Sequence, residues 1–385
     1  MPNVSHRTDG PLADAAGRLV RSGSADLDSA EACAPPGALL GIASRTGVRY
    51  AVAGDAQRIG GRECVPMGWD VRTDAGSVTK IVATSTALMS LVNAGEVDVD
   101  GPAARYLPEL AGQGASVREL LEHRAGLREW WPLYLSGAQG HDAITLAAAL
   151  PLRYEPGSGR HYSDLGFILL GELVARVAGA PLAEAVTELS LSQFGLTDTA
   201  YAAPIPGGPV AASSAGDSVE QGMIATGVPY PVAGAVGDFT RWRSHILVGE
   251  VNDGNAFHAF GGVAGHAGLF TTAADLLRFA HGALTSLAGD GPISASTMEA
   301  FTAAGADPAQ ALGFRRWRTA GGVAVGHTGF PGVAFALLPT QDAAVVMITN
   351  RLHASGRPRP TDAMWDDVLG AAQDELAEDR EGTST

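Results

Sequence analysis

Short apolar runs bounded by turn residues mark the predicted strands near the two ends of the chain. Near the start, GALLGIAS (37–44) and VRYAVAG (48–54) flank a turn at Arg45-Thr46-Gly47, a pattern typical of a β-hairpin. Near the end lie three more such runs, which predict consecutive antiparallel strands: VAVGHTGF (323–330), VAFALLP (333–339) and AAVVMITN (343–350).

Longer segments with apolar residues at helical spacing lie between and after these strands. The first begins at Ser77 and ends at Gly95, a common C-terminal stop, and it offers an apolar set for burial: Ile81, Ala87, Leu88, Leu91 and Val92. Further helices are predicted in SVRELLEHRAGL (116–127), YSDLGFILLGELVARVAG (162–179), PLAEAVTELSLSQFGL (181–196), DLLRFAHGAL (275–284) and TDAMWDDVLGAAQDEL (361–376).

This order of elements predicts an α/β fold of the α+β type. Strands from both ends of the chain most simply share one antiparallel sheet flanked by helices, with a mainly helical lobe inserted and a binding cleft between the two. The predicted parts are an N-terminal extension with one short helix (1–34), a sheet lobe (35–80 and 250–375), a helical lobe (81–249) and an acidic tail (376–385).

Composition excludes several classes of function. The formal net charge is -15 at pH 7 and no Lys/Arg cluster reverses it locally, so neither nucleic acid nor an anionic membrane is an expected partner. The N-terminus lacks the apolar core of an export signal, and no apolar run reaches the roughly 18 residues of a membrane span. Together with only two cysteines, Cys33 and Cys64, these features predict a soluble, cytoplasmic protein.

The first candidate for chemistry is Ser77-Val78-Thr79-Lys80, an S-x-x-K pattern at a predicted helix start. Positions i and i+3 share a helix face, so the Lys80 amine can reach the Ser77 hydroxyl, and the helix N-terminus favours developing negative charge. If burial lowers the pKa of Lys80, its amine can accept a proton near neutrality. The alternative is an N-cap serine followed by a surface lysine.

Two more segments add candidates. In Tyr162-Ser163-Asp164, a phenol close to a lysine could share the role of base, although a packing tyrosine and an Asp164 helix cap explain the pattern equally. In His327-Thr328-Gly329-Phe330, a polar pair followed by glycine interrupts an apolar strand, which fits a strand edge facing a ligand or simply a bulge.

In this order and spacing, the three segments resemble the active-site triplet of the superfamily of class C β-lactamases, DD-peptidases and serine esterases. The resemblance extends from about residue 36 to 350 and includes LLEHRAGL (120–127), EPGSGRHYSDLGFILLGEL (155–173), GGVAGHAGLFTTAADLLRFA (261–280) and GHTGFPG (326–332). It implies a β-lactamase/penicillin-binding-protein-like fold.

The resemblance also implies roles for individual residues. Ser77 would be the acylated nucleophile, with Lys80 and Tyr162 as the proton-transfer pair. The oxyanion hole would use the backbone N–H groups of Ser77 and Phe330. Substrate would contact Asp164, where many members have Asn, and His327, where many have Lys; the other expected contacts are Thr328, Gly329, His266 and Trp131.

These departures affect the expected substrate. His327 supplies a weaker, pH-dependent charge than lysine, so penicillin-like acids are less favoured. The predicted function is therefore acyl transfer through acyl-Ser77 on a small ester or amide, by a cytoplasmic esterase or amidase or by a transacylase that passes the acyl group to an amine or alcohol, as in antibiotic biosynthesis. The partners are a small acyl donor and acceptor, and no cofactor is expected. The alternatives are a penicillin-recognising DD-peptidase or β-lactamase and a non-catalytic binding module.

Two other groups of residues are weaker candidates for a functional site. His258, His266 and Asp253 suggest a metal site, but no HExxH pattern or compact triad accompanies them, so no metal is predicted and His266 is expected to border the cleft. An aromatic group at Trp130-Trp131 and Tyr134 could form a pocket wall or pack in the core.

Overall fold

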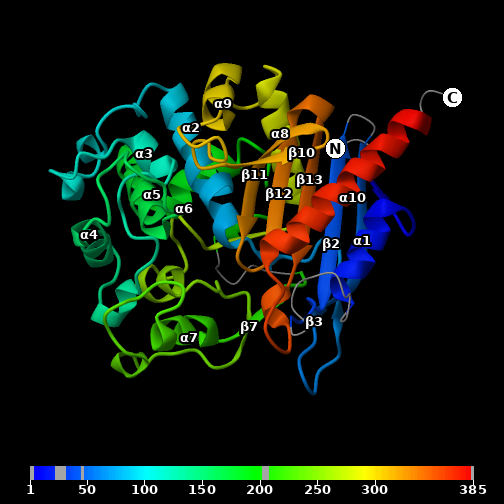
Figure 1. The fold of residues 1–385 in the computed structure, drawn as a ribbon, viewed down its shortest axis with the longest axis horizontal. Coiled ribbons are helices and arrows are strands. Elements are labelled where there is room, and N and C mark those ends of the chain that lie inside the picture. Colours follow the sequence, from blue (N-terminus) through cyan, green and yellow to red (C-terminus); the bar gives the residue numbers. More distant parts are fainter. Residues whose placement is uncertain (1–3, 22–31, 45–46, 202–207, 383–385) are drawn as a thin grey trace.

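The computed structural model describes residues 4–21, 32–44, 47–201 and 208–382. Figure 1 shows a sheet lobe and a mainly helical lobe side by side, as the sequence predicts. The predicted turn residues Arg45 and Thr46 lie outside the described residues, whereas the strands on either side of them form the expected hairpin.

The main sheet has the strand order β1-β3-β2-β13-β12-β11-β10, with β4 paired to β3. All its pairs are antiparallel except the short pairing of β1 with β3. The strands are β1 (Val4–His6), β2 (Gly37–Ser44), β3 (Gly47–Gln57), β4 (Val65–Pro66), β10 (Arg315–Thr319), β11 (Gly322–Gly329), β12 (Val333–Leu338) and β13 (Ala343–Thr349). The predicted single sheet built from both ends of the chain is therefore confirmed.

Both faces of this sheet are covered, which explains why its central strands read as unbroken apolar runs. Successive side chains of a strand point to opposite faces. In β13, Val346 and Ile348 accordingly belong to the core shared with the helical lobe, whereas Val345 and Met347 belong to a second core under α1 and α10. Helix α8 (Ala273–Leu287) packs on the first face.

The predicted N-terminal extension contributes to the sheet lobe. Helix α1 (Pro11–Val20) packs on β2, β3 and α10 (Thr361–Gly382), and it buries a face with the helical spacing of Leu12, Ala15, Ala16 and Leu19. This helix therefore packs as part of the sheet lobe, and the domain boundaries stay a prediction. The predicted acidic tail likewise continues α10 as far as Gly382.

The helical lobe surrounds α5, whose first turn enters the site. The remaining helices are α2 (Thr86–Asn93), α3 (Val117–Leu121), α4 (His141–Ala149), α5 (Asp164–Ala178), α6 (Leu182–Val186), α7 (Ser218–Thr226) and α9 (Ala295–Thr302). Small sheets are formed by β5 (Thr73–Asp74), β6 (Ala200–Tyr201) and β9 (Leu269–Thr271), and by β7 (Ala212–Ala215) and β8 (Ile246–Val248).

Within the described ranges, no single helix is long and apolar enough to cross a membrane. Helix α5, together with α6 and the π-helical stretch that follows it (Thr187–Leu191), reaches that length, but the two parts meet at an 81° bend.

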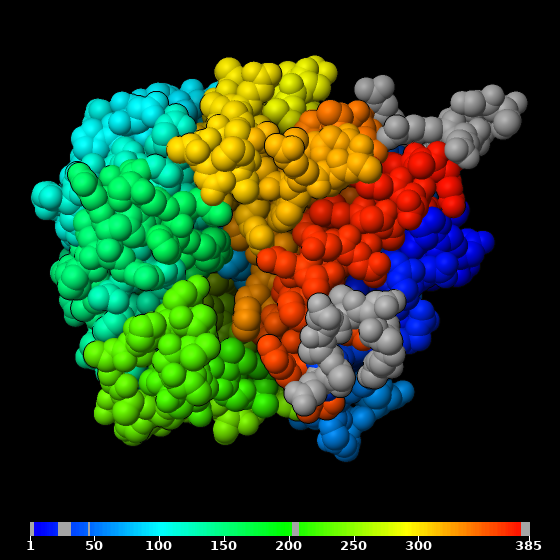
Figure 2. All heavy atoms as spheres, in the orientation of Figure 1, coloured from blue at the N-terminus to red at the C-terminus, as the bar shows by residue number. Residues whose placement is uncertain are grey.

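Figure 2 shows the surface hollowed between the green helical lobe and the orange strands of the sheet lobe.

Candidate active site

Ser77 lies at the start of a buried helical segment. A 3-10 turn (Gly76–Val78) leads into a π-helical stretch (Lys80–Ser85) and then into α2, so the helix predicted from Ser77 is confirmed with mixed geometry. The turn before it is fixed by Asp74, whose carboxylate accepts the backbone N–H of Gly76 at 2.8 Å and that of Asn252 at 2.7 Å.

Lys80 is completely buried and its ammonium group points at Ser77. Its Nζ donates to Ser77 Oγ at 2.9 Å, to Asp164 Oδ1 at 2.7 Å and to the carbonyl oxygen of His266 at 3.3 Å. An ammonium group has three hydrogens to donate, and here each has an acceptor. The alternative of a surface lysine behind an N-cap serine is therefore wrong.

The pKa of Lys80 differs in direction from the expectation. Burial lowers the pKa, but the negative charge of Asp164 and the nearby Tyr162 raise it by more, so the pKa of Lys80 lies above its ordinary value. The predicted burial-lowered pKa is thus incorrect, because the sequence does not reveal that Asp164 forms an ion pair with this amine. Lys80 is an ammonium ion at neutral pH.

Tyr162 lies against Lys80 at the start of α5. The centre of its ring is 4.8 Å from Lys80 Nζ, and the other neighbours of the ring are His123 at 4.5 Å and His327 at 5.9 Å between ring centres. Burial raises the pKa of Tyr162, and the positive charge of Lys80 offsets part of that increase. Ser163, rather than Asp164, caps α5 by accepting the N–H of Gly166, which leaves Asp164 free to pair with Lys80.

His327 lies on β11 in regular register, opposite Phe335 of β12, so the alternative of a bulge is wrong. Its Nδ1 is 2.7 Å from the carbonyl oxygen of Thr328, which can only accept, so Nδ1 carries the hydrogen and Nε2 is an acceptor. Burial and the charges of Lys80 and Arg315 hold the pKa of His327 well below its usual range. The expected pH-dependent charge is therefore corrected to a neutral imidazole.

Two glycines allow the end of β11 to approach the Ser77 turn. A Cβ on Gly329 would lie 2.4 Å from the carbonyl oxygen of Ala75, and one on Gly76, whose φ is +49°, would lie 2.4 Å from Pro331. This approach brings Ser77 and Phe330 to the walls of the same cavities, as an oxyanion hole of their N–H groups requires. Arg351 supports the loop by donating to the carbonyl oxygen of Phe330.

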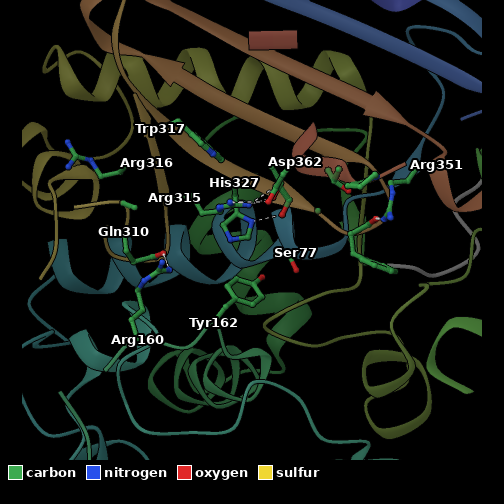
Figure 3. Close-up of a pocket in the computed structure, with 16 residues that line it drawn as sticks. Ser77, Arg160, Tyr162, Gln310, Arg315, Arg316, Trp317, His327, Arg351 and Asp362 are labelled. Atoms are coloured by element: carbon green, nitrogen blue, oxygen red, sulfur yellow. Dashed lines mark hydrogen bonds and ion pairs between the residues drawn. The ribbon is translucent and has the colours of Figure 1, made fainter. Parts of the chain in front are cut away.

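Two cavities meet at Ser77, Tyr162 and Phe330. The basic cavity, of about 650 Å³, is lined by Arg160, Arg315, Arg316, Arg351, His327, Thr328, Gly329 and Asp362, among others (Figure 3). The acidic cavity, of about 360 Å³, is lined by Asp74, Asp164, Glu220 and Asp253 together with Trp130, Met223 and Tyr230. A substrate bound across Ser77 can thus place one half in each cavity.

Sequence reasoning missed three residues of the site. Arg315 of β10 is paired in register with Gly326, which brings its guanidinium to Thr328, and Asp362 reaches the same place from the first turn of α10. His123 supports Tyr162 and accepts the N–H of Ser163. The strand pairing of RRWRT with VAVGHTG is the signal that could have located Arg315.

Two predicted substrate contacts lie elsewhere. His266 is buried and outside both cavities; its side chain bonds Asp253 at 2.9 Å and only its carbonyl oxygen reaches Lys80. Trp131 stacks against Arg128 and lines neither cavity, whereas its neighbour Trp130 lines the acidic one. His258 is bonded to Asp217 in the core. Among the described residues, no three His, Cys, Asp or Glu side chains are grouped as metal ligands.

Comparison with known proteins decides the family. Residues 27–368 match the family model described as Beta-lactamase. The chain belongs to the beta-lactamase family. Two similar curated proteins are an N-acetylmuramyl-L-alanine amidase of Bacillus subtilis (strain 168), 30% identical over 83% of this chain and 78% of the relative, and a protein of Escherichia coli (strain K12) provisionally named D-alanyl-D-alanine carboxypeptidase, 29% identical over 73% and 69%.

Solved structures agree on the fold. EstCE1, described as a hydrolase with promiscuous acyltransferase activity, superposes with a TM-score of 0.68 at 19% identity, over 94% of this chain and 97% of its own. The beta-lactamase family consists of serine hydrolases, and in this member Ser77, Lys80 and Tyr162 lie together in one cleft. The chain is therefore placed among serine hydrolases.

Proposed function

We propose that the protein is an acyl-transfer enzyme that forms an ester between Ser77 and the acyl group of a small ester or amide. The observation that carries this proposal is the 2.9 Å contact between Ser77 Oγ and Lys80 Nζ, with Lys80 itself fully buried. Ser77 Oγ accepts this bond, so its own hydrogen remains available to a base. A binding module would have no need for a buried ammonium group directed at a serine.

Tyr162 is the group proposed to take the proton of Ser77. Lys80 is held as an ammonium by Asp164 and cannot accept a further proton. Tyr162 acts in its phenolate form, which burial makes the minor form at neutral pH and which the positive charge of Lys80 stabilises. As the Ser77 oxygen attacks the carbonyl carbon, the oxygen that becomes negative is bound by the N–H groups of Ser77 and Phe330. Tyr162 then returns the proton to the departing amine or alcohol as its bond to the acyl carbon breaks.

The leaving half of the substrate is proposed to occupy the basic cavity and the acyl half the acidic cavity. Support comes from the curated relatives, since one is named an amidase and the other a carboxypeptidase. Arg315 and Thr328 lie in the basic cavity, where they suit a polar leaving group. Amide substrates are thus favoured alongside esters.

The acceptor that releases the acyl group is proposed to enter through the same basic cavity after the leaving group departs. Water there gives hydrolysis, and an amine or alcohol bound there gives transacylation. The cavity, at about 650 Å³, has room for a small acceptor beside Ser77. Transacylation is the second candidate on this ground.

A substrate panel tests the proposal. Hydrolysis of short p-nitrophenyl esters and of N-acyl amino acids would be measured for wild type, Ser77→Ala and Tyr162→Phe, with and without added amine. We expect Ser77→Ala to remove turnover and Tyr162→Phe to reduce kcat by roughly 10²- to 10⁴-fold, the usual contribution of a general base. Turnover that persists in Ser77→Ala would overturn the proposal, and faster loss of donor with amine would indicate transacylation.

A further inference from the structure

An acidic side chain of the protein occupies the anion-binding position of the basic cavity. Asp362 Oδ1 lies 2.9 Å from Arg315 Nη1, and Oδ2 lies 3.3 Å from Nη2. The same Arg315 Nη1 donates to Thr328 Oγ1 at 2.7 Å, and that hydroxyl lies 3.3 Å from Asp362 Oδ1. Figure 3 shows Arg315 and Asp362 pointing toward each other next to His327, in the cavity that also contains Ser77.

This is the bidentate arrangement in which a guanidinium commonly binds a carboxylate. A substrate carboxylate entering the basic cavity would seek the same two Arg315 nitrogens and the same Thr328 hydroxyl. Asp362 already has them, so the two carboxylates cannot both be bound in this way.

The other cavity arginines are less suited to replace Arg315. Arg160 is paired with Asp307 at 2.6 Å, and Arg316 donates to the carbonyl oxygen of Pro308 at 3.3 Å. Arg351 donates to the carbonyl oxygens of Phe330 and Arg359 and stacks on the Phe330 ring, which uses it to support the loop. Arg315 is the one that bonds to Thr328, next to His327.

A substrate carboxylate can nevertheless replace Asp362 in its ion pair with Arg315. The Asp362 side chain is 61% exposed and that of Arg315 is 32% exposed, and exposed ion pairs of this kind are weak. Asp362 lies in the first turn of α10, at the rim of the cavity, and can therefore turn toward solvent without disturbing a core.

We propose that Asp362 is a specificity-determining residue that competes with the carboxylate of the substrate for Arg315 and Thr328. The proposal rests on the proposed function, because it concerns the leaving half of a substrate cleaved at Ser77. The native enzyme accordingly discriminates against leaving groups that end in a free carboxylate, relative to the same groups ending in a neutral carboxamide.

The test compares two substrates that differ only at this end: an N-acyl dipeptide with a free C-terminal carboxylate and its C-terminal carboxamide. The quantity measured is the ratio of kcat/KM for the carboxylate to kcat/KM for the carboxamide. In Asp362→Asn and Asp362→Ala we expect this ratio to rise about 2- to 5-fold, as befits the loss of one exposed competitor. In Arg315→Met the ratio falls, because the anion site is lost.

The matched control is Asp367→Asn. Asp367 also lies on α10, but its carboxylate pairs with Arg18 of α1 at 2.9 Å, so this variant removes a charge from the same helix without removing a bond to Arg315. We expect it to leave the ratio unchanged. A ratio that is unchanged or lower in both Asp362 variants, or that rises equally in Asp367→Asn, overturns the inference. Turnover of both substrates by Ser77→Ala would instead overturn the proposed function.

Discussion

Lys80 Nζ and Asp164 Oδ1 lie 2.7 Å apart, with Lys80 fully buried and Asp164 20% exposed. Buried lysine normally tends toward the neutral form. Here the carboxylate reverses that tendency and keeps the amine charged beside Ser77. This ion pair therefore determines the charge of the amine beside Ser77.

Replacing Asp164 with Asn should move the pH dependence of the reaction to lower pH. Without the carboxylate, the pKa of Tyr162 falls, because a negative charge near its phenolate is removed. Tyr162, the proposed acceptor of the Ser77 proton, then becomes competent at a lower pH. We expect the acidic limb of the profile of kcat/KM against pH to shift down by about one unit or more.

The control for that experiment is Asp307→Asn, which removes an exposed carboxylate paired with Arg160 at the edge of the basic cavity. Its acidic limb should coincide with that of wild type. An acidic limb in Asp164→Asn that stays in place or moves to higher pH would show that the ion pair does not govern the base.

Gly329 and Gly370 should respond oppositely to alanine. At Gly329 the added methyl group would meet the carbonyl oxygen of Ala75 at 2.4 Å, so the end of β11 must move away from the Ser77 turn. We expect Gly329→Ala to lower the free energy of unfolding by about 1–3 kcal/mol and to reduce kcat. Gly370 lies within α10, and a Cβ added there would have no atom within 4 Å apart from the backbone of its own helix. Gly370→Ala should therefore raise the free energy of unfolding by about 0.5–1 kcal/mol.

Urea unfolding and ester hydrolysis of both variants check this pair of expectations. Gly329→Ala with wild-type kcat would mean that the approach of β11 to Ser77 does not matter to the oxyanion hole.

Much of the architecture follows from the sequence, for a physical reason. The strands of the sheet are buried on both faces, and the helix that begins at Ser77 has a regular apolar set, so both stand out as patterns. Ser77, Lys80 and Tyr162 could be singled out because their order and spacing match a known triplet, and the structure places them together. Their catalytic roles stay predictions. The cytoplasmic location, the lack of nucleic-acid or membrane partners and the small-molecule partners stay predictions.

The charges inside the cleft could not be predicted, because they depend on contacts between distant segments. Asp164 meets Lys80 across 84 positions of the chain, and Arg315 meets Asp362 across 47. The sequence therefore gives no direct measure of the pKa of Lys80 or of the anion site. The sequence also does not show which of two adjacent tryptophans faces the cleft. Trp130 lines the acidic cavity, whereas the predicted Trp131 does not.

The buried pair of Asp217 and Arg243 should stabilise the helical lobe near the acidic cavity. Asp217 accepts from Arg243 Nε at 2.9 Å and from His258 Nε2 at 2.9 Å, and all three side chains are at most 5% exposed. Asp217→Asn removes the nearer counter-charge of the Arg243 guanidinium and leaves Glu250, whose Oε2 is 3.8 Å from Nη1, so we expect the free energy of unfolding to fall by at most about 3–5 kcal/mol. Denaturant unfolding at neutral pH measures this loss.

The same loss should depend on pH. Burial raises the pKa of Asp217, but the bonds from His258 and Arg243 outweigh it and bring the pKa to about 2. The stabilisation is complete at a pH above the pKa of an unfolded aspartate, about 4, and disappears as the pH falls toward 2. The difference in the free energy of unfolding between wild type and Asp217→Asn should therefore become smaller over that interval. A difference that stays constant would mean that the carboxylate charge contributes nothing.

The most direct measurement for the central claim is the intact mass of the protein after brief incubation with an activated acyl donor, for wild type, Ser77→Ala and Asp362→Asn. Wild type and Asp362→Asn should gain the mass of one acyl group, Ser77→Ala should gain none, and peptide mapping should place the group on Ser77. An acyl group carried equally by Ser77→Ala, or no adduct on wild type with any donor that it consumes, would contradict the acyl-Ser77 mechanism.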